Sequence, residues 1–243
     1  MIKIIIHITK FIIATITALL FASCNFNMNS IEGSGNVTTE KRIVQGEFKN
    51  VSVSNAIDLV IEQSDSTEII VEADDNIQKE ITTKVENGTL VISCKFSSFN
   101  NVTKKVTVKM PVIDKIEASS ASSVHSENVI QGENINIEAS SASTINVNVE
   151  SDNITCDSGS GSTINIEGKA LKIKTSAASG SSINAENLLA NEVEAEAASG
   201  ASVNVHPILR LKADASSGAS IHYDSSPKTI EKSESSGGSI SQG

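Results

Sequence analysis

The sequence Glu117-Ala-Ser-Ser-Ala-Ser-Ser-Val124 is the first of seven related phrases, and its recurrence decides the fold. Glu138-Ala-Ser-Ser-Ala-Ser-Thr-Ile145 and Asp157-Ser-Gly-Ser-Gly-Ser-Thr-Ile164 follow, and later copies end at Ile183, Val203, Ile221 and Ile240. The closing aliphatic residues are 21, 19, 19, 20, 18 and 19 residues apart. A fixed period of this size is typical of a solenoid, in which no single repeat can bury its apolar face alone.

Equivalent positions of the repeat carry equivalent side chains. Every copy has serine four positions before its closing aliphatic, alanine or glycine three positions before it, and a hydroxyl residue directly before it. The residue after the closing aliphatic is asparagine in four copies and histidine in two, His125 and His222. Neighbouring strands of a parallel stack lie about 4.8 Å apart, so identical side chains form ladders. The sequence therefore predicts a structural ladder of stacked amides at Asn146, Asn165, Asn184 and Asn204.

The period predicts an all-β parallel β-helix with coils of about 19–20 residues, because three short strands and three corners need roughly 18–22 residues at strand rise. A right-handed coil is favoured. Leucine-rich repeats have a similar period, but the recurrent leucines of their pattern are missing. Serine-rich disorder is the other reading, and the regularly returning Ile and Val residues argue against it.

The charge and residue composition of the chain indicate which kinds of partner and core it can have. The formal net charge is −10 and the sequence pI is about 4.9, which argues against nucleic acid as a partner, because phosphate binding requires a basic face. Aromatic residues make up only 3% of the chain, which suits a narrow coil filled by Ile, Val, Ala and Ser.

The N-terminal residues 1–23 have the features of an export signal. Lys3 and Lys10 precede an apolar run at residues 11–22, and small residues stand before Cys24. This pattern predicts a bacterial lipoprotein with lipidation at Cys24, anchored to the membrane and placed in the outer membrane, facing either the periplasm or the surface. A transmembrane anchor is the alternative, but the run is short for a bilayer. Residues 24–40 are expected to be a tether.

The rest of the chain divides into an N-terminal β-rich part, residues 41–112, and the repetitive β-helix, residues 113–243. Asn87-Gly88 predicts a tight hairpin in the first part, which should form irregular coils or a sheet that caps the stack. The last repeat places Lys232 and Glu234 where earlier copies have small or apolar residues, which predicts a polar terminal cap. Cys94 and Cys156 are expected to face inward as free thiols, although a disulfide stays open.

Phrases in the first part resemble those of a known family. Gly33-Ser-Gly-Asn36, Ala56-Ile-Asp-Leu-Val-Ile61, Val71-Glu-Ala-Asp-Asp-Asn76 and Gly88-Thr-Leu-Val-Ile92 follow the order found in the DUF2807 family. The family is described as auto-transporter adhesins with a head GIN domain, typically lipoproteins or secreted proteins of Bacteroidetes. The resemblance covers roughly residues 31–243 and implies a parallel β-helix. It brings no catalytic motif, and its adhesin label rests on analogy of fold.

One position of the repeat, seven residues before the closing aliphatic, carries acidic side chains that could take part in catalysis or metal binding. They are Glu117, Glu138, Asp157, Glu196 and Asp214. A weak Ca²⁺ site is conceivable there, but an outward-facing solvated column without clustered Lys or Arg is the expectation. Serines that recur in every copy indicate a scaffold, and no histidine is placed to activate one. No catalytic residue, metal ligand or cofactor is expected, and no ligand-binding residue can be named.

The sequence thus predicts a cell-envelope lipoprotein of adhesin or interaction type, which binds a carbohydrate or protein without catalysis and does not bind nucleic acid. A polysaccharide-active β-helix enzyme, which needs facing carboxylates, is the first alternative. A structural envelope protein without a ligand is the second.

Overall fold

The computed structural model describes residue 10 and residues 31–95 and 99–243. The expected lipidation site Cys24, and nearly all of the expected signal peptide, lie outside the described residues. The chain divides into two compact units, residues 1–31 and residues 32–243, and the stack of strands belongs to the second. In the part of the chain that is described, no helix has the length and apolarity needed to cross a membrane.

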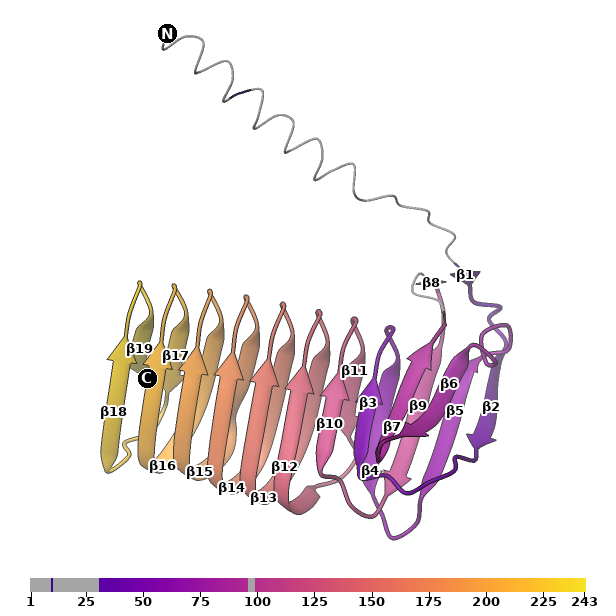
Figure 1. Ribbon diagram of the computed structural model, residues 1–243, viewed down its shortest axis with the longest axis horizontal. Helices are drawn as coiled ribbons and strands as arrows, with labels where there is room; N and C mark the ends of the chain where they lie inside the picture. Colours follow the sequence, from indigo (N-terminus) through magenta and orange to yellow (C-terminus); the bar gives the residue numbers. More distant parts are fainter. Residues whose placement is uncertain (1–9, 11–30, 96–98) are drawn as a thin grey trace. The chain divides into compact units, whose positions relative to one another are not determined.

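The repeats form one parallel stack, which confirms the all-β solenoid (Figure 1). Each strand pairs with the strand one repeat later, so that Ile145 lies beside Ile164 and Ile164 beside Ile183. The five long strands are β12 (Ile130–Ala139), β13 (Thr144–Ser158), β14 (Thr163–Ala177), β15 (Ser182–Ala197) and β16 (Ser202–Ala215). The shorter strands of the stack are β10 (Lys115–Ala118), β11 (Ser123–Ser126), β17 (Ser220–Tyr223), β18 (Thr229–Glu234) and β19 (Ser239–Gln242).

Each central coil, from β13 to β16, is one long strand that bends, followed by a short turn, rather than the three separate strands expected. Fifteen residues of straight strand would extend roughly 50 Å, yet Thr163 at the start of β14 lies beside Ser182 at the start of β15. In β14 the alternation of buried and exposed residues breaks at residues 171–172, which are both exposed, and Gly168 just before them has φ 121°. The bend gives every coil two outer faces.

The interior of the stack is filled by small and aliphatic side chains at alternating positions. In β14, Ile164, Ile166 and Ile173 are at most 2% exposed, and their counterparts in neighbouring coils are buried in the same way. Stacking each buried column on the next removes apolar area from water at about 25 cal/mol per Å². This packing explains why so few aromatic residues suffice.

The sharp turn between coils uses two successive residues with positive φ. The serine four positions before the closing aliphatic has φ between 49° and 58° in all seven copies, and the alanine or glycine after it has φ between 60° and 79°. The backbone N–H of Gly161 donates to the carbonyl of Ser179 one coil later, at 3.1 Å, and the other turns repeat this bond. Serine rarely adopts positive φ, because its Cβ then approaches a carbonyl oxygen. The hydrogen bonds between turns offset this conformational strain.

A second set of serines, two positions before the closing aliphatic, joins successive coils. Ser143, Ser162 and Ser181 are buried, and each hydroxyl donates to a backbone carbonyl of the previous coil at 2.7–2.9 Å. Each hydroxyl also accepts a backbone N–H of its own turn at 3.1 Å. The recurring serines of the turns therefore serve as structural links.

We expect Ser162→Ala to lower the free energy of unfolding by about 1 kcal/mol, because it removes a buried hydrogen bond and leaves a polar group less well paired. Denaturant unfolding followed by circular dichroism measures the loss. Ser176→Ala is the matched control, since the Ser176 hydroxyl has no hydrogen-bond partner among the described residues. A loss equal to that of the control would show that the link contributes nothing.

The N-terminal part supplies further coils of the same stack. Val51 of β3 (Asn50–Val53) lies beside Ile116, and Leu59 of β4 (Asp58–Gln63) lies beside Val124. Asn55 and Ala56 between these strands have φ 69° and 54°, as in the repetitive turns. Strands β7 (Thr89–Cys94) and β9 (Lys104–Met110) add one more parallel layer beyond β3 and β4.

Antiparallel strands close the N-terminal end. β5 (Glu68–Asp74) pairs with β9, β2 (Val37–Arg42) pairs with β5, and β6 (Ile81–Glu86) forms a hairpin with β7. Asn87 and Gly88 have φ 51° and 75°, so the expected tight hairpin is confirmed. A separate two-stranded sheet joins β1 (Ile31–Glu32) and β8 (Phe99–Asn100). Irregular coils and a capping sheet are thus both present.

The folded unit begins earlier than residue 41, since β2 lies mostly within the range expected to be a tether. The Gly33–Asn36 phrase is held against Asp74 and Asp75. Asp74 is 1% exposed and accepts the N–H of Gly35 at 2.7 Å, while Ser34 and Asn36 donate to Asp75 at 2.6 and 2.8 Å. These hydrogen bonds lower the pKa of Asp75. Two phrases far apart in sequence therefore form one local structure.

Cys94 and Cys156 are both buried and both free, as expected. Burial raises the pKa of the Cys156 thiol well above its usual range, which disfavours the reactive thiolate.

Candidate functional site

The repetitive coils present two polar surfaces. We call the surface around the closing aliphatics and the residues after them the asparagine face, and the surface of the second half of each long strand the charged face. Side chains that alternate with the buried ones point outward, so each face is a set of parallel columns of residues.

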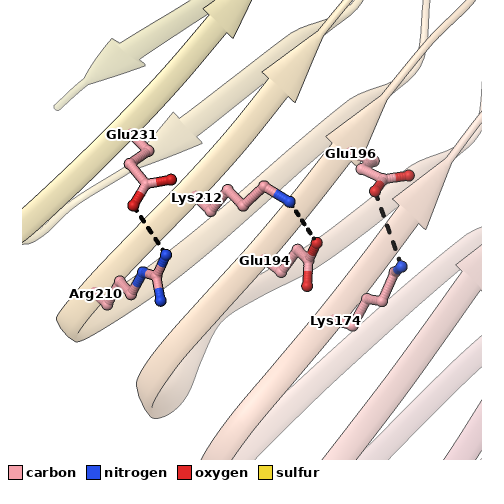
Figure 2. Close-up of polar contacts among 6 residues, drawn as sticks. All are labelled: Lys174, Glu194, Glu196, Arg210, Lys212 and Glu231. Atoms are coloured by element: carbon pink, nitrogen blue, oxygen red, sulfur yellow. Dashed lines mark hydrogen bonds and ion pairs between the residues drawn. The ribbon is translucent and has the colours of Figure 1, made fainter.

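The charged face carries ion pairs that run from coil to coil (Figure 2). Arg210 lies 2.8 Å from Glu231, and Lys212 lies 2.9 Å from Glu194. Lys174 lies 3.9 Å from Glu196 in the adjacent coil. The hydrogen bond from Lys212 lowers the pKa of Glu194. A shallow hollow of about 390 Å³ lies beside these groups.

The predicted acid column exists, but its expected isolation from cations is wrong. Glu117, Glu138 and Asp157 are neighbours in register, and Glu196 and Asp214 continue the column. Lys115 lies 3.7 Å from Glu117 and 2.8 Å from Glu138. Lysines two residues before an acid point to the same face of the strand, which places them beside the column. No group of three or more His, Cys, Asp or Glu side chains suited to a metal ion occurs in the described ranges.

Asp157 is the member of this column with a raised pKa. Partial burial is the main cause, and the carboxylate of Glu138, directly opposite in register, adds to it. The pKa of Asp157 is higher in the folded chain than its ordinary value of 3.8, so ionisation of this carboxyl group destabilises the folded state.

We expect Asp157→Asn to raise the free energy of unfolding by about 0.5 kcal/mol at neutral pH, the size of one like-charge cross-strand pair. As a residue Asp157 is exposed, so solvent screening keeps the effect small. The gain should be absent below pH 3.8, where both states are protonated, and should appear as pH rises through the folded pKa. Urea unfolding at several pH values, with the exposed Asp152→Asn as control, tests this.

The asparagine face contains the predicted ladder. The Nδ2 of Asn165 donates to the Oδ1 of Asn146 at 2.7 Å, and Asn184 donates to Asn165 at 2.7 Å. Asn204 donates to Asn184 at 2.9 Å. His125 and His222 occupy the same column at its two ends.

A groove of about 420 Å³ runs along this ladder. Val147 and Ile166 line it, but their side chains are at most 4% exposed and face the interior of the coil. The polar lining of the groove is His125, Ser126, Asn146, Asn148, Asn165, Glu167, Asn184, Glu186 and Asn187. The volume falls within the range of about 300–1,000 Å³ found for small-molecule sites.

An irregularity in β15 forms one end of the groove. The register of β14 with β15 shifts between Asn165 and Gly168, and the register of β15 with β16 shifts between Ala185 and Leu189. Glu186 and Asn187 lie in this bulge and are exposed. Neither residue belongs to a column in which one residue type recurs throughout the repeats, so the pattern of residue types does not predict them. The signal was the repeat length, which is 20 residues from Ile183 to Val203 and 18 from Val203 to Ile221.

The histidines on this face contact polar groups at the surface. His206 Nδ1 lies 2.7 Å from Asp224, and His125 Nε2 lies 3.7 Å from Glu127. His222 Nδ1 lies 3.3 Å from the hydroxyl of Ser241, the one serine hydroxyl found next to a histidine within the described residues. None of these pairs has the third group that orients a nucleophilic triad in the part of the chain described.

A family model described as "Putative auto-transporter adhesin, head GIN domain" matches residues 47–227. Among solved structures, a "putative adhesin" from Bacteroides fragilis has a TM-score of 0.82 at 24% identity, covering 88% of this chain and 100% of its own. A "putative lipid binding protein" from Parabacteroides distasonis has a TM-score of 0.72 at 21% identity, covering 88% and 100%. A "putative adhesin" from Parabacteroides merdae has a TM-score of 0.70 at 20% identity, covering 88% and 99%. At these identities the likeness establishes the fold. Comparison with functionally curated proteins gives no match.

Proposed function

The chain belongs to this auto-transporter adhesin family, and we propose that it is a non-catalytic binding protein of the cell envelope. In this proposal, lipidation at Cys24 anchors it in the outer membrane, and the solenoid presents its polar faces to a carbohydrate or protein partner. The family assignment supports an adhesin-like role at the envelope or cell surface.

The observation that carries the proposal is the repetition of polar groups on a rigid scaffold. The amide ladder and the ion pairs of the charged face repeat at the strand spacing of about 4.8 Å. Regular arrays of this kind suit many weak contacts made at once, whose combined affinity exceeds that of each one. The net charge of −10 disfavours nucleic acid as the partner.

Binding can be tested with the purified full-length protein in mild detergent. We expect it to bind at least one class of immobilised glycan, extracellular-matrix protein or envelope polysaccharide more strongly than an unrelated acidic protein does. Absence of binding above this control would contradict the proposal and favour a structural envelope protein. Release of shorter oligosaccharides from any bound polysaccharide would contradict its non-catalytic part.

Localisation needs a separate measurement. Added protease should degrade the protein on intact cells if it is surface exposed, and metabolic labelling with a fatty-acid analogue should label the wild type but not Cys24→Ala. A protein that is protected from protease in intact cells and degraded only after the outer membrane is opened would exclude direct adhesion to another cell.

A further inference from the structure

We propose that the groove of the asparagine face binds a linear, uncharged glycan that lies along the solenoid axis. This inference rests on the proposed function and names the chemistry of the ligand. Its three parts are the open hydrogen-bonding capacity of the ladder, the unpaired groups of the bulge, and the match between the ladder's repeat and that of a sugar chain.

The amide ladder offers hydrogen bonds that the protein does not use. An asparagine side chain has two N–H donors and an oxygen with two lone pairs. Asn165 spends one donor on Asn146 and receives one hydrogen bond from Asn184. One donor and one lone pair therefore remain on this amide, and its fixed neighbours orient it. Fixed polar groups lose less conformational entropy when they bind a ligand than free side chains do.

The bulge of β15 adds polar groups without partners. Glu186 and Asn187 make no side-chain hydrogen bond or ion pair with any described residue, and both are exposed beside the ladder. Glu167 accepts a hydrogen bond from Asn148 at 3.0 Å and keeps the rest of its capacity. The charged face differs, because its Lys174, Arg210 and Lys212 side chains each pair with an acid of an adjacent coil. Bulges are frequent next to functional sites.

The composition of the groove favours a glycan over a polypeptide. Protein hot spots are built on aromatic and arginine side chains, whereas the outward side chains of this lining are amides, carboxylates, a serine and a histidine. The strands below the groove are paired on both sides, so a peptide cannot add to them as a further strand. Amides both donate to and accept from sugar hydroxyls, carboxylates accept from them, and hydrogen bonds to a carboxylate are the stronger ones.

The spacing of the ladder and the charge of the groove indicate which kind of glycan would bind. A sugar residue in an extended β-linked chain advances by a distance similar to the strand spacing of about 4.8 Å, so successive sugars would meet successive asparagines. Glu167 and Glu186 line the groove, and the net charge of the chain is −10. The groove carboxylates and the negative net charge repel a polyanionic glycan, which favours an uncharged glycan as the ligand.

The experiment is a binding titration of the full-length protein with β-linked glucose, mannose and N-acetylglucosamine oligomers, from the disaccharide to the hexasaccharide. Oligogalacturonates of the same lengths are the anionic series. We expect at least one uncharged series to bind, with affinity rising about tenfold up to about four sugars and then by less than about twofold. This plateau is expected because the groove spans four coils, from that of His125 to that of Asn184.

Two variants test the site itself. Asn165→Leu interrupts the ladder, and the pair Glu186→Ala/Asn187→Ala removes the bulge groups at exposed positions that do not support the core. Each is expected to weaken binding about tenfold. Asn153→Leu is the control, because it breaks a comparable amide contact, 3.1 Å to Asn134, in the other half of the coil. It should leave binding unchanged.

The outcomes separate this inference from the proposed function. If no uncharged oligomer binds while a matrix or envelope protein does, the glycan assignment is overturned and the binding function stands. Preferred binding of the anionic series, or equal losses in Asn153→Leu and the groove variants, also overturns it. If neither sugars nor proteins bind, both proposals fail. Thermal unfolding of each variant shows whether a loss comes from misfolding, and the exposed bulge pair decides the case if Asn165→Leu is unstable.

Discussion

Gly168→Ala is expected to lower the free energy of unfolding by about 3 kcal/mol or more, because strain and a clash between backbone atoms act together. Gly168 has φ 121°, a conformation that residues with a Cβ rarely adopt. A Cβ built there would also lie against the carbonyl oxygen of Val149 in the previous coil, well inside van der Waals contact. Neither backbone can yield without disturbing the register of β13 with β14, so the bend itself would have to change.

Gly161→Ala provides the matched control, since it also places a Cβ at positive φ. Gly161 has φ 69°, and nothing lies within 4 Å of its would-be Cβ. Ala121 and Ala142 already occupy the equivalent position with φ 60° and 61°. The cost should therefore be about 1 kcal/mol. Denaturant midpoints of the two variants, followed by far-ultraviolet circular dichroism, measure the difference, and equal losses would show that the approach to Val149 does not matter.

These two glycines mark how far the sequence predicts the fold. The turn glycines recur at a fixed position in the repeat, so their role is visible from the pattern. The neighbouring coils have Val149 and Leu188 at the position of Gly168, so the repeat does not predict a glycine there. The close approach of the adjacent coil explains why a glycine is needed. The turn serines are a similar case, because nothing in their chemistry predicts positive φ in all seven copies.

The first coils of the stack could not be recognised from the sequence, because an inserted stretch separates them from the repeats. Asn55-Ala56 and Leu59 reproduce the turn and the closing aliphatic, but Leu59 precedes its partner Val124 by a stretch that contains β5, β6, β7 and β9. A period can be read only where copies follow one another without interruption. The ladder of Asn146, Asn165, Asn184 and Asn204 could be predicted for the same reason, whereas the bulge at Glu186 appeared only as an unequal repeat length.

The double variant Lys232→Ala/Glu234→Ala is expected to associate end to end at least about tenfold more tightly than the wild type. Both residues stand at inward-facing positions of the last coil, where the previous coil has the buried Ala213 and Ala215. Lys232 Nζ lies 4.6 Å from the centroid of the Tyr223 ring. Glu234 accepts the backbone N–H of Ile240 at 2.6 Å.

These contacts protect an otherwise open edge. β18 and β19 pair with the preceding coil, and no described strand lies beyond them. Alanine at both positions would extend the apolar column to the end of the stack and free the Ile240 N–H for another chain. Two such ends related by a two-fold axis would pair as antiparallel strands, which predicts a closed dimer rather than a filament.

Sedimentation equilibrium over a range of protein concentrations measures this association, with circular dichroism to verify that the solenoid is intact. Lys212→Ala/Glu194→Ala is the control, because it removes one cation and one anion from the charged face without opening the end. The control should remain as monomeric as the wild type. A folded end variant that stays monomeric would reject a protective role for Lys232 and Glu234, since the same unpaired backbone edge would then be harmless without their charges.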